Sequence, residues 1–207
     1  MKIGKVTPIY KTGNRELIEN YRPISTLPIF GKIFEKIIYN RFYSFFLSQS
    51  ILDDSQFGFR KGHSTGHAIH HSVNIIKNAH TTNKHVIGIF IDLSKAFDTL
   101  DHKILLEKLY NCGIRGIAHD LIGSYLSNRK QYTSILGENS TTESVEFGVP
   151  QGSVLGPLLF LLYINDIKIA TEKMDVNLFY MLMTPICLSS ILAEIWQLKR
   201  QIEFSLH

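Results

Sequence analysis

The sequence predicts an α/β fold, because long helical patterns alternate with segments of strand length. The clearest strand is the apolar run over residues 86–91, which is typical of a strand buried on both faces and ends abruptly at Asp92. The clearest helices are an amphipathic segment over residues 29 to about 47 and an apolar segment over residues 153 to about 164. We expect the strand to be central in its sheet, with helices packed around it.

The first 85 residues begin as extended chain and continue as two helices. Residues 5–28 mix short β-prone runs with turn residues, so we expect extended chain and loop there. The following helix has apolar residues at helical spacing, namely Phe30, Ile33, Phe34, Ile37, Ile38 and Phe42. A polar loop over residues 53–66 leads into a second helix that begins at Ser64 or Thr65 and ends near Ala79.

Shorter elements are expected in the second half of the chain. Asp101 can cap a helix over residues 104–110, which Gly113 ends, and another short helix follows over about 117–126. Residues 131–136 and 144–147 predict a hairpin around residues 137–139. A turn at residues 150–152 then leads into the apolar helix.

Length and composition exclude several protein classes. The 207 residues suit one domain, or one domain and part of another. The N-terminus has no apolar signal core, and the most apolar run is too short to cross a bilayer. Two cysteines exclude a disulfide scaffold and suit a reducing compartment. We therefore expect an intracellular protein of the cytoplasm or nucleus, with no signal peptide, transmembrane segment or membrane partner.

The charges are unevenly distributed along the chain. Residues 1–85 carry 12 Lys and Arg against 5 Asp and Glu, whereas residues 86–207 carry 10 against 13. This split fits a part that binds a polyanion, joined to a part that holds a metal ion. The charge distribution alone is explained equally well by chance.

Three segments combine residues suited to nucleotide chemistry, although each alone also fits a plain loop or turn. Asp92 directly follows the buried strand, where a carboxylate and a neighbouring carbonyl can hold Mg²⁺. Residues 148–152 place two glycines around Pro150 and Gln151, so that backbone can approach a ligand closely. Basic residues among aromatic ones suit phosphate contact with stacking, at Lys11, Arg15, Tyr21, Arg22, Phe57, Phe59, Arg60 and Lys61.

Together these segments resemble the reverse transcriptases of non-LTR (LINE-like) retrotransposons, from the jockey-like side of that group. The resemblance runs from about Ile3 to Tyr180. It rests on five motifs in the family's order: NYRPIS at 20–25, QFGFR at 56–60, D…AFD…DH at 92–102, YLSNR at 125–129 and GVPQGSVLGP at 148–157. It implies a right-hand polymerase fold, with fingers over residues 1–85 and a partial palm over residues 86–180.

The resemblance also implies site residues, a cofactor and partners. Asp92 would be the catalytic carboxylate, binding Mg²⁺ with help from the Leu93 carbonyl, for attack of a primer 3′-OH on the α-phosphate. The partners would be an RNA template, a DNA primer and a dNTP, with the oligomeric state left open. Lys11 and Arg22 would contact the triphosphate, and Arg60 would lie on the template side. Phe97 would be the steric gate against the sugar. Gln151 and Gly152 would contact the nucleotide and the template base.

The family's second carboxylate motif, an aromatic residue followed by Ala-Asp-Asp, is missing from its expected position. Leu178, Phe179 and Tyr180 arrive at the right spacing, but residues 181–184 read Met-Leu-Met-Thr. Asp166 and Asp175 precede that position and are poor substitutes. We therefore expect an inactive polymerase. The alternatives are a non-catalytic nucleic-acid-binding remnant, or an enzyme completed by another chain or by translational frameshifting.

The genetic code suggests why the motif is missing. If Leu182 is encoded by CTG, the frame that starts at the third base of the Met181 codon reads GCT GAT GAC, which encodes Ala-Asp-Asp. Residues 181–207 would then be an out-of-frame tail in a decaying element copy. The competing hypothesis is an in-frame substitution followed by a genuine helical tail. By the same resemblance, we expect the upstream endonuclease and the thumb to be absent.

Overall fold

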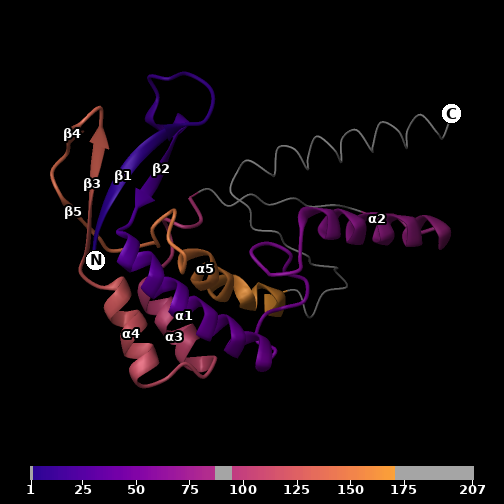
Figure 1. The fold of residues 1–207 in the computed structure, drawn as a ribbon. Coiled ribbons are helices and arrows are strands. Elements are labelled where there is room, and N and C mark those ends of the chain that lie inside the picture. The colour runs from indigo at the N-terminus through magenta and orange to yellow at the C-terminus, as the bar shows by residue number, and fades with distance from the viewer. Residues whose placement is uncertain (1, 87–94, 171–207) are drawn as a thin grey trace. The chain divides into compact units, whose positions relative to one another are not determined.

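The computed structural model describes residues 2–86 and 95–170, and they have a mixed α/β fold as predicted (Figure 1). They form two compact units, one made of residues 2–52 with 95–170 and the other of residues 53–86. The predicted strand at residues 86–91 lies almost entirely outside the described residues. So do Asp92, Leu93 and the tail after Tyr180.

The first unit contains a sheet with strand order β2-β1-β3-β4, in which β5 also pairs with β3. Strands β1 (Ile3–Tyr10) and β2 (Tyr21–Thr26) are antiparallel, and β3 (Arg129–Ile135) lies parallel to β1. The short strands β4 (Glu138–Asn139) and β5 (Glu143–Val145) both run antiparallel to β3. The sheet therefore joins the start of the chain to its middle.

The pairing of β1 with β2 goes beyond the extended chain and loop that the sequence predicts. Pro8 and Pro23 obscure these strands in the sequence, because proline cannot donate to a strand ladder. The register places Pro8 opposite Pro23, so both missing donors fall at one position of the ladder. The turn residues between the strands form a loop that contains a single 3-10 turn, η1 (Ile18–Asn20).

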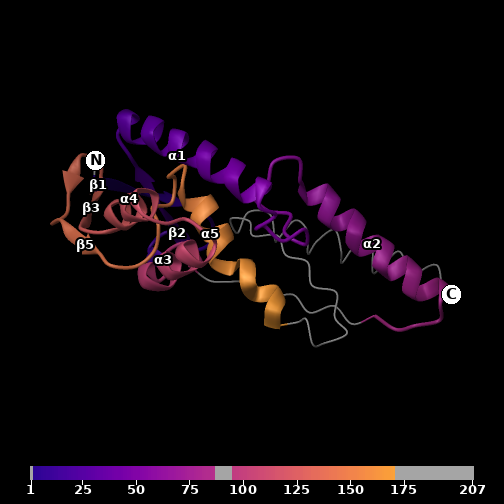
Figure 2. The ribbon, with the colours of Figure 1, turned by 90° about the horizontal axis from the view of Figure 1, so that it is seen from below.

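Four helices and a 3-10 segment complete the first unit, and the strands stand at one end of it (Figures 1 and 2). They are α1 (Ile29–Ser48), α3 (His102–Asn111), α4 (Ile117–Leu126), α5 (Gly156–Ile164) and η2 (Asn165–Ala170). Helix α3 packs against both α4 and α5. Residues 158–162 of α5 are all buried, so this apolar helix lies in the core.

Local sequence signals placed most of these elements correctly. The carboxylate of Asp101 caps α3 as predicted, accepting from the backbone N–H of Lys103 at 2.7 Å and of Ile104 at 3.1 Å. The predicted hairpin turns at Leu136 and Gly137, which both have positive φ. Helix α5 begins later than predicted, since Ser153 Oγ accepts from the Gly156 N–H and holds the preceding turn.

The apolar residues of α1 are divided between the core and the surface. The helix buries Ile38, Phe42, Tyr43 and Phe46, together with the charged residue Glu35. Phe30, Ile33, Phe34 and Ile37 are instead exposed, Phe30 by 80%. Apolar residues lie on more than one side of this helix, so their spacing predicts a helix without selecting its buried face.

The second unit consists of a loop and the helix α2 (Thr65–Thr81). As predicted, the helix begins after Ser64, whose side chain accepts from the backbone N–H of His67 at 3.3 Å. It extends two residues beyond Ala79, the predicted end. Within the described ranges, no helix is both long enough and apolar enough to span a membrane.

Candidate functional site

The loop at residues 148–152 is held in place by backbone hydrogen bonds on two sides. The N–H of Gly148 donates to the Leu100 carbonyl at 2.7 Å, and the N–H of Val149 donates to the Phe97 carbonyl at 2.8 Å. On the other side, the N–H of Ser25 on β2 donates to the Gln151 carbonyl at 2.7 Å. The loop is thus fixed between β2 and the segment that precedes α3.

The two glycines of this loop are required by the protein's own backbone. Gly148 has φ 78°, and a Cβ there would lie 2.6 Å from the Phe97 carbonyl oxygen and 2.7 Å from Asp98 Cα. Gly152 has φ 109°, and a Cβ there would lie 2.8 Å from the Ser25 carbonyl oxygen. The sequence predicted close backbone approach to a ligand, whereas these contacts show close approach to β2 and to residues 97–98.

The side chains of Asp98, before α3, and of His102, its first residue, contact the loop, while the ring of Phe97 packs against α5. Asp98 accepts from Gln151 Nε2, which lies 3.1 Å from Oδ1 and 3.0 Å from Oδ2. His102 Nε2 lies 2.7 Å from the Gly148 carbonyl oxygen. The half-buried ring of Phe97 lies against Phe160 of α5, with 5.0 Å between ring centroids. The structure therefore brings together Phe97, Gln151 and Gly152, which the sequence singled out separately.

Arg22 and Lys11 lie at the same end of the β1–β2 pair. Arg22 stands opposite Ile9, and Lys11 directly follows Tyr10, the last residue of β1. Lys11 is exposed, whereas Nε and Nη2 of Arg22 are buried and have no hydrogen-bond partner among the described residues. Because buried polar groups are normally paired, these two donors stand out as unsatisfied within the described residues.

A cavity of about 210 Å³ lies between the sheet and the loop. Its walls come from β1, β2 and β3 on one side and from residues 145–151 on another. Polar side chains in its lining include Ser25, Asp98, Gln131 and Gln151. Residues 147–151, which include most of the loop, thus form part of the cavity wall.

A buried carboxylate supports the segment that follows the loop. Glu35 of α1 is 3% exposed and accepts from Tyr125 Oη at 2.9 Å, from Val154 N at 2.6 Å and from Leu155 N at 3.4 Å. Burial, and then the neighbouring Glu35 carboxylate, raise the pKa of Tyr125 well above its ordinary value, so the phenol stays a donor. Glu35 thereby joins α1 and α4 to the N-terminal side of α5.

A family model described as reverse transcriptase (RNA-dependent DNA polymerase) matches residues 9–181, well over half of the chain. The chain belongs to the reverse transcriptase family. Its motifs and its relatives make it a reverse transcriptase domain of the non-LTR retrotransposon type, as the sequence resemblance predicted.

The relatives of this reverse transcriptase domain are much longer proteins. One is "Probable RNA-directed DNA polymerase from transposon X-element" of Drosophila melanogaster, 37% identical over 86% of this chain and 19% of the relative. Another is "RNA-directed DNA polymerase from mobile element jockey" of the same species, 33% identical over 85% of this chain and 19% of the relative. A third, from the type-1 retrotransposable element R1 of Bradysia coprophila, is 33% identical over 73% of this chain and 14% of the relative. The chain spans about a fifth or less of these relatives.

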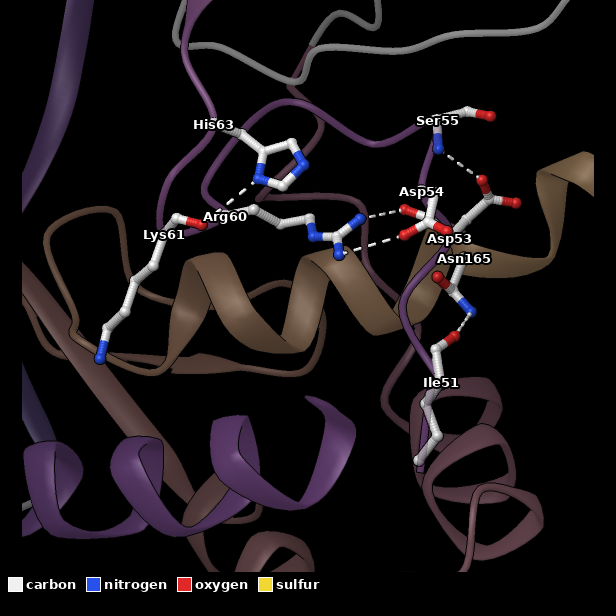
Figure 3. A network of polar contacts seen from close by, with 8 residues as sticks. All are labelled: Ile51, Asp53, Asp54, Ser55, Arg60, Lys61, His63 and Asn165. Carbon is white, nitrogen blue, oxygen red and sulfur yellow. Dashed lines mark hydrogen bonds and ion pairs between the residues drawn. The ribbon is translucent and has the colours of Figure 1, made fainter. Parts of the chain in front are cut away.

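Arg60 of the reverse transcriptase domain is engaged within its own loop in the second unit (Figure 3). Its Nη1 donates to the Asp53 carbonyl at 2.5 Å and its Nη2 lies 3.5 Å from Asp54 Oδ1, while the Arg60 side chain is only 9% exposed. The same loop is tightened by Ser55 N, which donates to Asp53 Oδ1 at 2.7 Å. Separately, in the first unit, Asn165 Nδ2 donates to the Ile51 carbonyl at 2.7 Å (Figure 3).

The predicted metal ligands, Asp92 and Leu93, fall outside the residues that the structure describes. Within residues 2–86 and 95–170 there is no group of three or more His, Cys, Asp or Glu side chains that could hold a metal ion. Reverse transcriptases generally use divalent metal ions, but the described residues do not themselves make such a site. The assignment of Asp92 and Leu93 to Mg²⁺ stays a prediction.

Three residues of the site had no assigned role at the sequence level: Glu35, Asp98 and His102. Asp98 and His102 belong to the quoted motif at residues 92–102, so their presence in that motif was the available signal. Glu35 gave none, since a single Glu within a helix is ordinarily a surface residue. Only the fold shows that it is buried beside backbone donors.

Proposed function

We propose that this reverse transcriptase domain binds template, primer and dNTP with the loop at residues 148–152 as its nucleotide contact, but does not polymerise DNA. The binding role is supported by one observation: backbone hydrogen bonds hold this loop between β2 and residues 97–100, beside a cavity. Residues 1–85 would be the fingers and residues 86–180 a partial palm. Phe97 would be the steric gate, and Arg60 would lie on the template side.

The unpartnered guanidinium nitrogens of Arg22 support its proposed contact with the triphosphate. Replacing Arg22 with methionine removes the charge and the donors but keeps an unbranched apolar stem. A hydrogen bond to a charged group contributes about 1.5–3 kcal/mol, so we expect dNTP affinity to fall at least tenfold. Calorimetric titration measures this, with Arg41→Met on the exposed side of α1 as the matched control. Equal losses in both variants would refute a specific role for Arg22.

The proposed inactivity depends on the segment after Tyr180. No carboxylate stands at residues 181–184, where the family carries Ala-Asp-Asp, and the family match itself ends at residue 181. Both facts support a frameshift after Tyr180, with residues 181–207 out of frame. Sequencing the coding DNA tests this hypothesis, because a frameshift requires an overlapping Ala-Asp-Asp reading across codons 181–184.

Primer extension on an RNA template tests the inactivity directly. Loss of metal-held charge stabilisation costs many powers of ten in rate, so we expect no template-dependent incorporation with Mg²⁺ or Mn²⁺. The control is an active reverse transcriptase on the same template and primer. Incorporation by this chain that disappears in Asp92→Ala would overturn the proposal and show that Asp92 is required for that activity.

A non-catalytic nucleic-acid-binding remnant is the second candidate function, favoured by the excess of basic residues over residues 1–85. It predicts binding to an RNA–DNA hybrid that weakens steeply with salt, without any dependence on dNTP.

A third candidate, an enzyme completed by another chain or by translational frameshifting, predicts a full-length product in cells. Binding assays and detection of that product separate the three.

A further inference from the structure

Histidine is concentrated on α2 and beside it. Six of the protein's nine histidines fall within residues 63–85, namely His63, His67, His70, His71, His80 and His85. Residues 53–86 also contain four lysine and arginine residues, and their only acidic residues are Asp53 and Asp54. Because histidine is the side chain that ordinarily changes charge between pH 5 and 8, this part of the chain is positive at neutral pH and becomes more so in mild acid.

The helical spacing gathers several of these side chains on one face of α2. Residues three and four positions apart are neighbours on a helix surface. This spacing joins the residues that we call the histidine face: His67, His70, His71, Asn74 and Lys77. All five are exposed, whereas the buried Ala68 and the half-buried Ile69 lie on the other side of the helix. The histidine face is therefore polar, accessible and without a carboxylate of its own.

The loop that precedes α2 contributes the other charged groups near the start of the helix: Asp53, Asp54, Arg60 and Lys61. Both carboxylates have contacts within that loop, since Asp54 Oδ1 lies 3.5 Å from Arg60 Nη2 and Asp53 Oδ1 accepts from the backbone N–H of Ser55 at 2.7 Å. The ring of Phe57 lies against His71, with 5.9 Å between ring centroids. The loop thus packs at His71, and the exposed rings of His67 and His70 extend the face beyond it.

We propose that the histidine face of α2 binds the phosphate backbone of nucleic acid, and that protonation of His67 and His70 strengthens this binding as the pH falls. A phosphate beside an imidazole favours the protonated ring. Binding therefore takes up protons, and by linkage the affinity for phosphate must rise as protons become more available. This surface is separate from the nucleotide contact proposed for the loop at residues 148–152, and the proposal does not depend on that contact.

The composition of the histidine face favours nucleic acid over an anionic membrane. A helix that lies on a membrane inserts large apolar side chains between its cations. In α2, which the structure describes in full, Ile76 is the one large apolar residue that is exposed, and helical spacing places it on the other side from His67 and His70. The 17 residues of α2 span about 25 Å, which is long enough to meet several successive phosphates.

Fluorescence anisotropy of the full chain with a rhodamine-labelled oligouridine of about 20 nucleotides tests the proposal, because uridine has no group that titrates between pH 6.0 and 7.5. We expect the Kd to be about tenfold lower at pH 6.0 than at pH 7.5. The slope of log affinity against log salt should also steepen at pH 6.0, by about 0.7 for each histidine that gains a charge. An affinity that does not change with pH would overturn the proposal and leave any binding to lysine and arginine alone.

Two paired substitutions assign the pH effect to the histidine face. His67→Gln with His70→Gln removes the titrating groups but keeps polar side chains that favour a helix, so most of the gain at pH 6.0 should be lost. His67→Lys with His70→Lys carries permanent charges and should bind tightly at both pH values. The control is His119→Gln on α4, which should keep the gain, and circular dichroism checks that every variant is folded. An equal gain in the glutamine pair and in the control would refute the role of His67 and His70.

A second ligand separates nucleic acid from lipid as the source of phosphate. Vesicles of phosphatidylcholine with about a third phosphatidylserine should show no binding that depends on His67 and His70. Binding to these vesicles but not to oligouridine, lost in the glutamine pair, would assign the face to anionic lipid and overturn the proposal. Failure to bind oligouridine at either pH would also overturn it, while titration with dNTP would still decide the nucleotide contact of the loop at residues 148–152.

Discussion

Replacing Glu35 with alanine is expected to lower the free energy of unfolding by about 3–5 kcal/mol. The substitution leaves the Tyr125 hydroxyl and the backbone N–H groups of Val154 and Leu155 without their acceptor. Each buried donor left unpaired costs about 1–3 kcal/mol, and the vacated volume in the core adds to this cost. Urea unfolding followed by circular dichroism measures the change.

Two further variants separate the hydrogen bonds of Glu35 from its size and charge. Glu35→Gln keeps the shape and one acceptor, so we expect a smaller loss than for alanine. Glu107→Ala removes an exposed Glu from the interior of α3 and should change stability by less than 0.5 kcal/mol, as surface substitutions usually do. If Glu35→Ala and Glu107→Ala cost the same, the buried network does not stabilise the domain.

Replacing Gly148 with alanine is expected to lower the free energy of unfolding by about 2–5 kcal/mol. The positive φ of Gly148 costs an L-residue about 1–2 kcal/mol. The added Cβ would also lie 2.6 Å from the Phe97 carbonyl oxygen, and forcing atoms into a well-packed region costs about 1–3 kcal/mol more. Backbone would have to move, so the loop would lose its hydrogen bonds to residues 97–100.

Gly137→Ala is the matched control for this prediction. Gly137 also has positive φ, at 94°, but a Cβ there would meet no atom within 4 Å. It therefore reports the cost of the backbone conformation alone, about 1–2 kcal/mol. Thermal unfolding of both variants gives the difference. Equal destabilisation would mean that the close contact of Gly148 with residues 97–98 has no energetic consequence.

Features that depend on neighbouring residues were predictable from the sequence. The helices α2, α3 and α4 follow from apolar spacing and local end signals: Asp101 caps α3 as predicted, and α2 begins at Thr65, one of its two predicted starts. The turn of the hairpin between β3 and β4 lies close to its predicted position, because its signal is also local.

Features that depend on distant partners were not predictable in the same way. Strands β1 and β2 have proline at opposite positions, which disguises them until the register shows the two prolines paired. The apolar residues of α1 give no indication that Phe30 is exposed while Phe46 is buried. Which face of a helix is buried depends on what packs against it, and spacing alone does not contain that information.

The sequence by itself determined the family of this protein, because motifs in a characteristic order carry that information without any coordinates. It also showed that residues 181–184 contain no carboxylate. Only the tertiary structure decided how the candidate site is held: Glu35 behind the loop, Asp98 against Gln151, and Gly148 against Phe97. The physical reason is that hydrogen bonds and close contacts between residues 50 to 120 positions apart depend on packing, which local patterns do not specify.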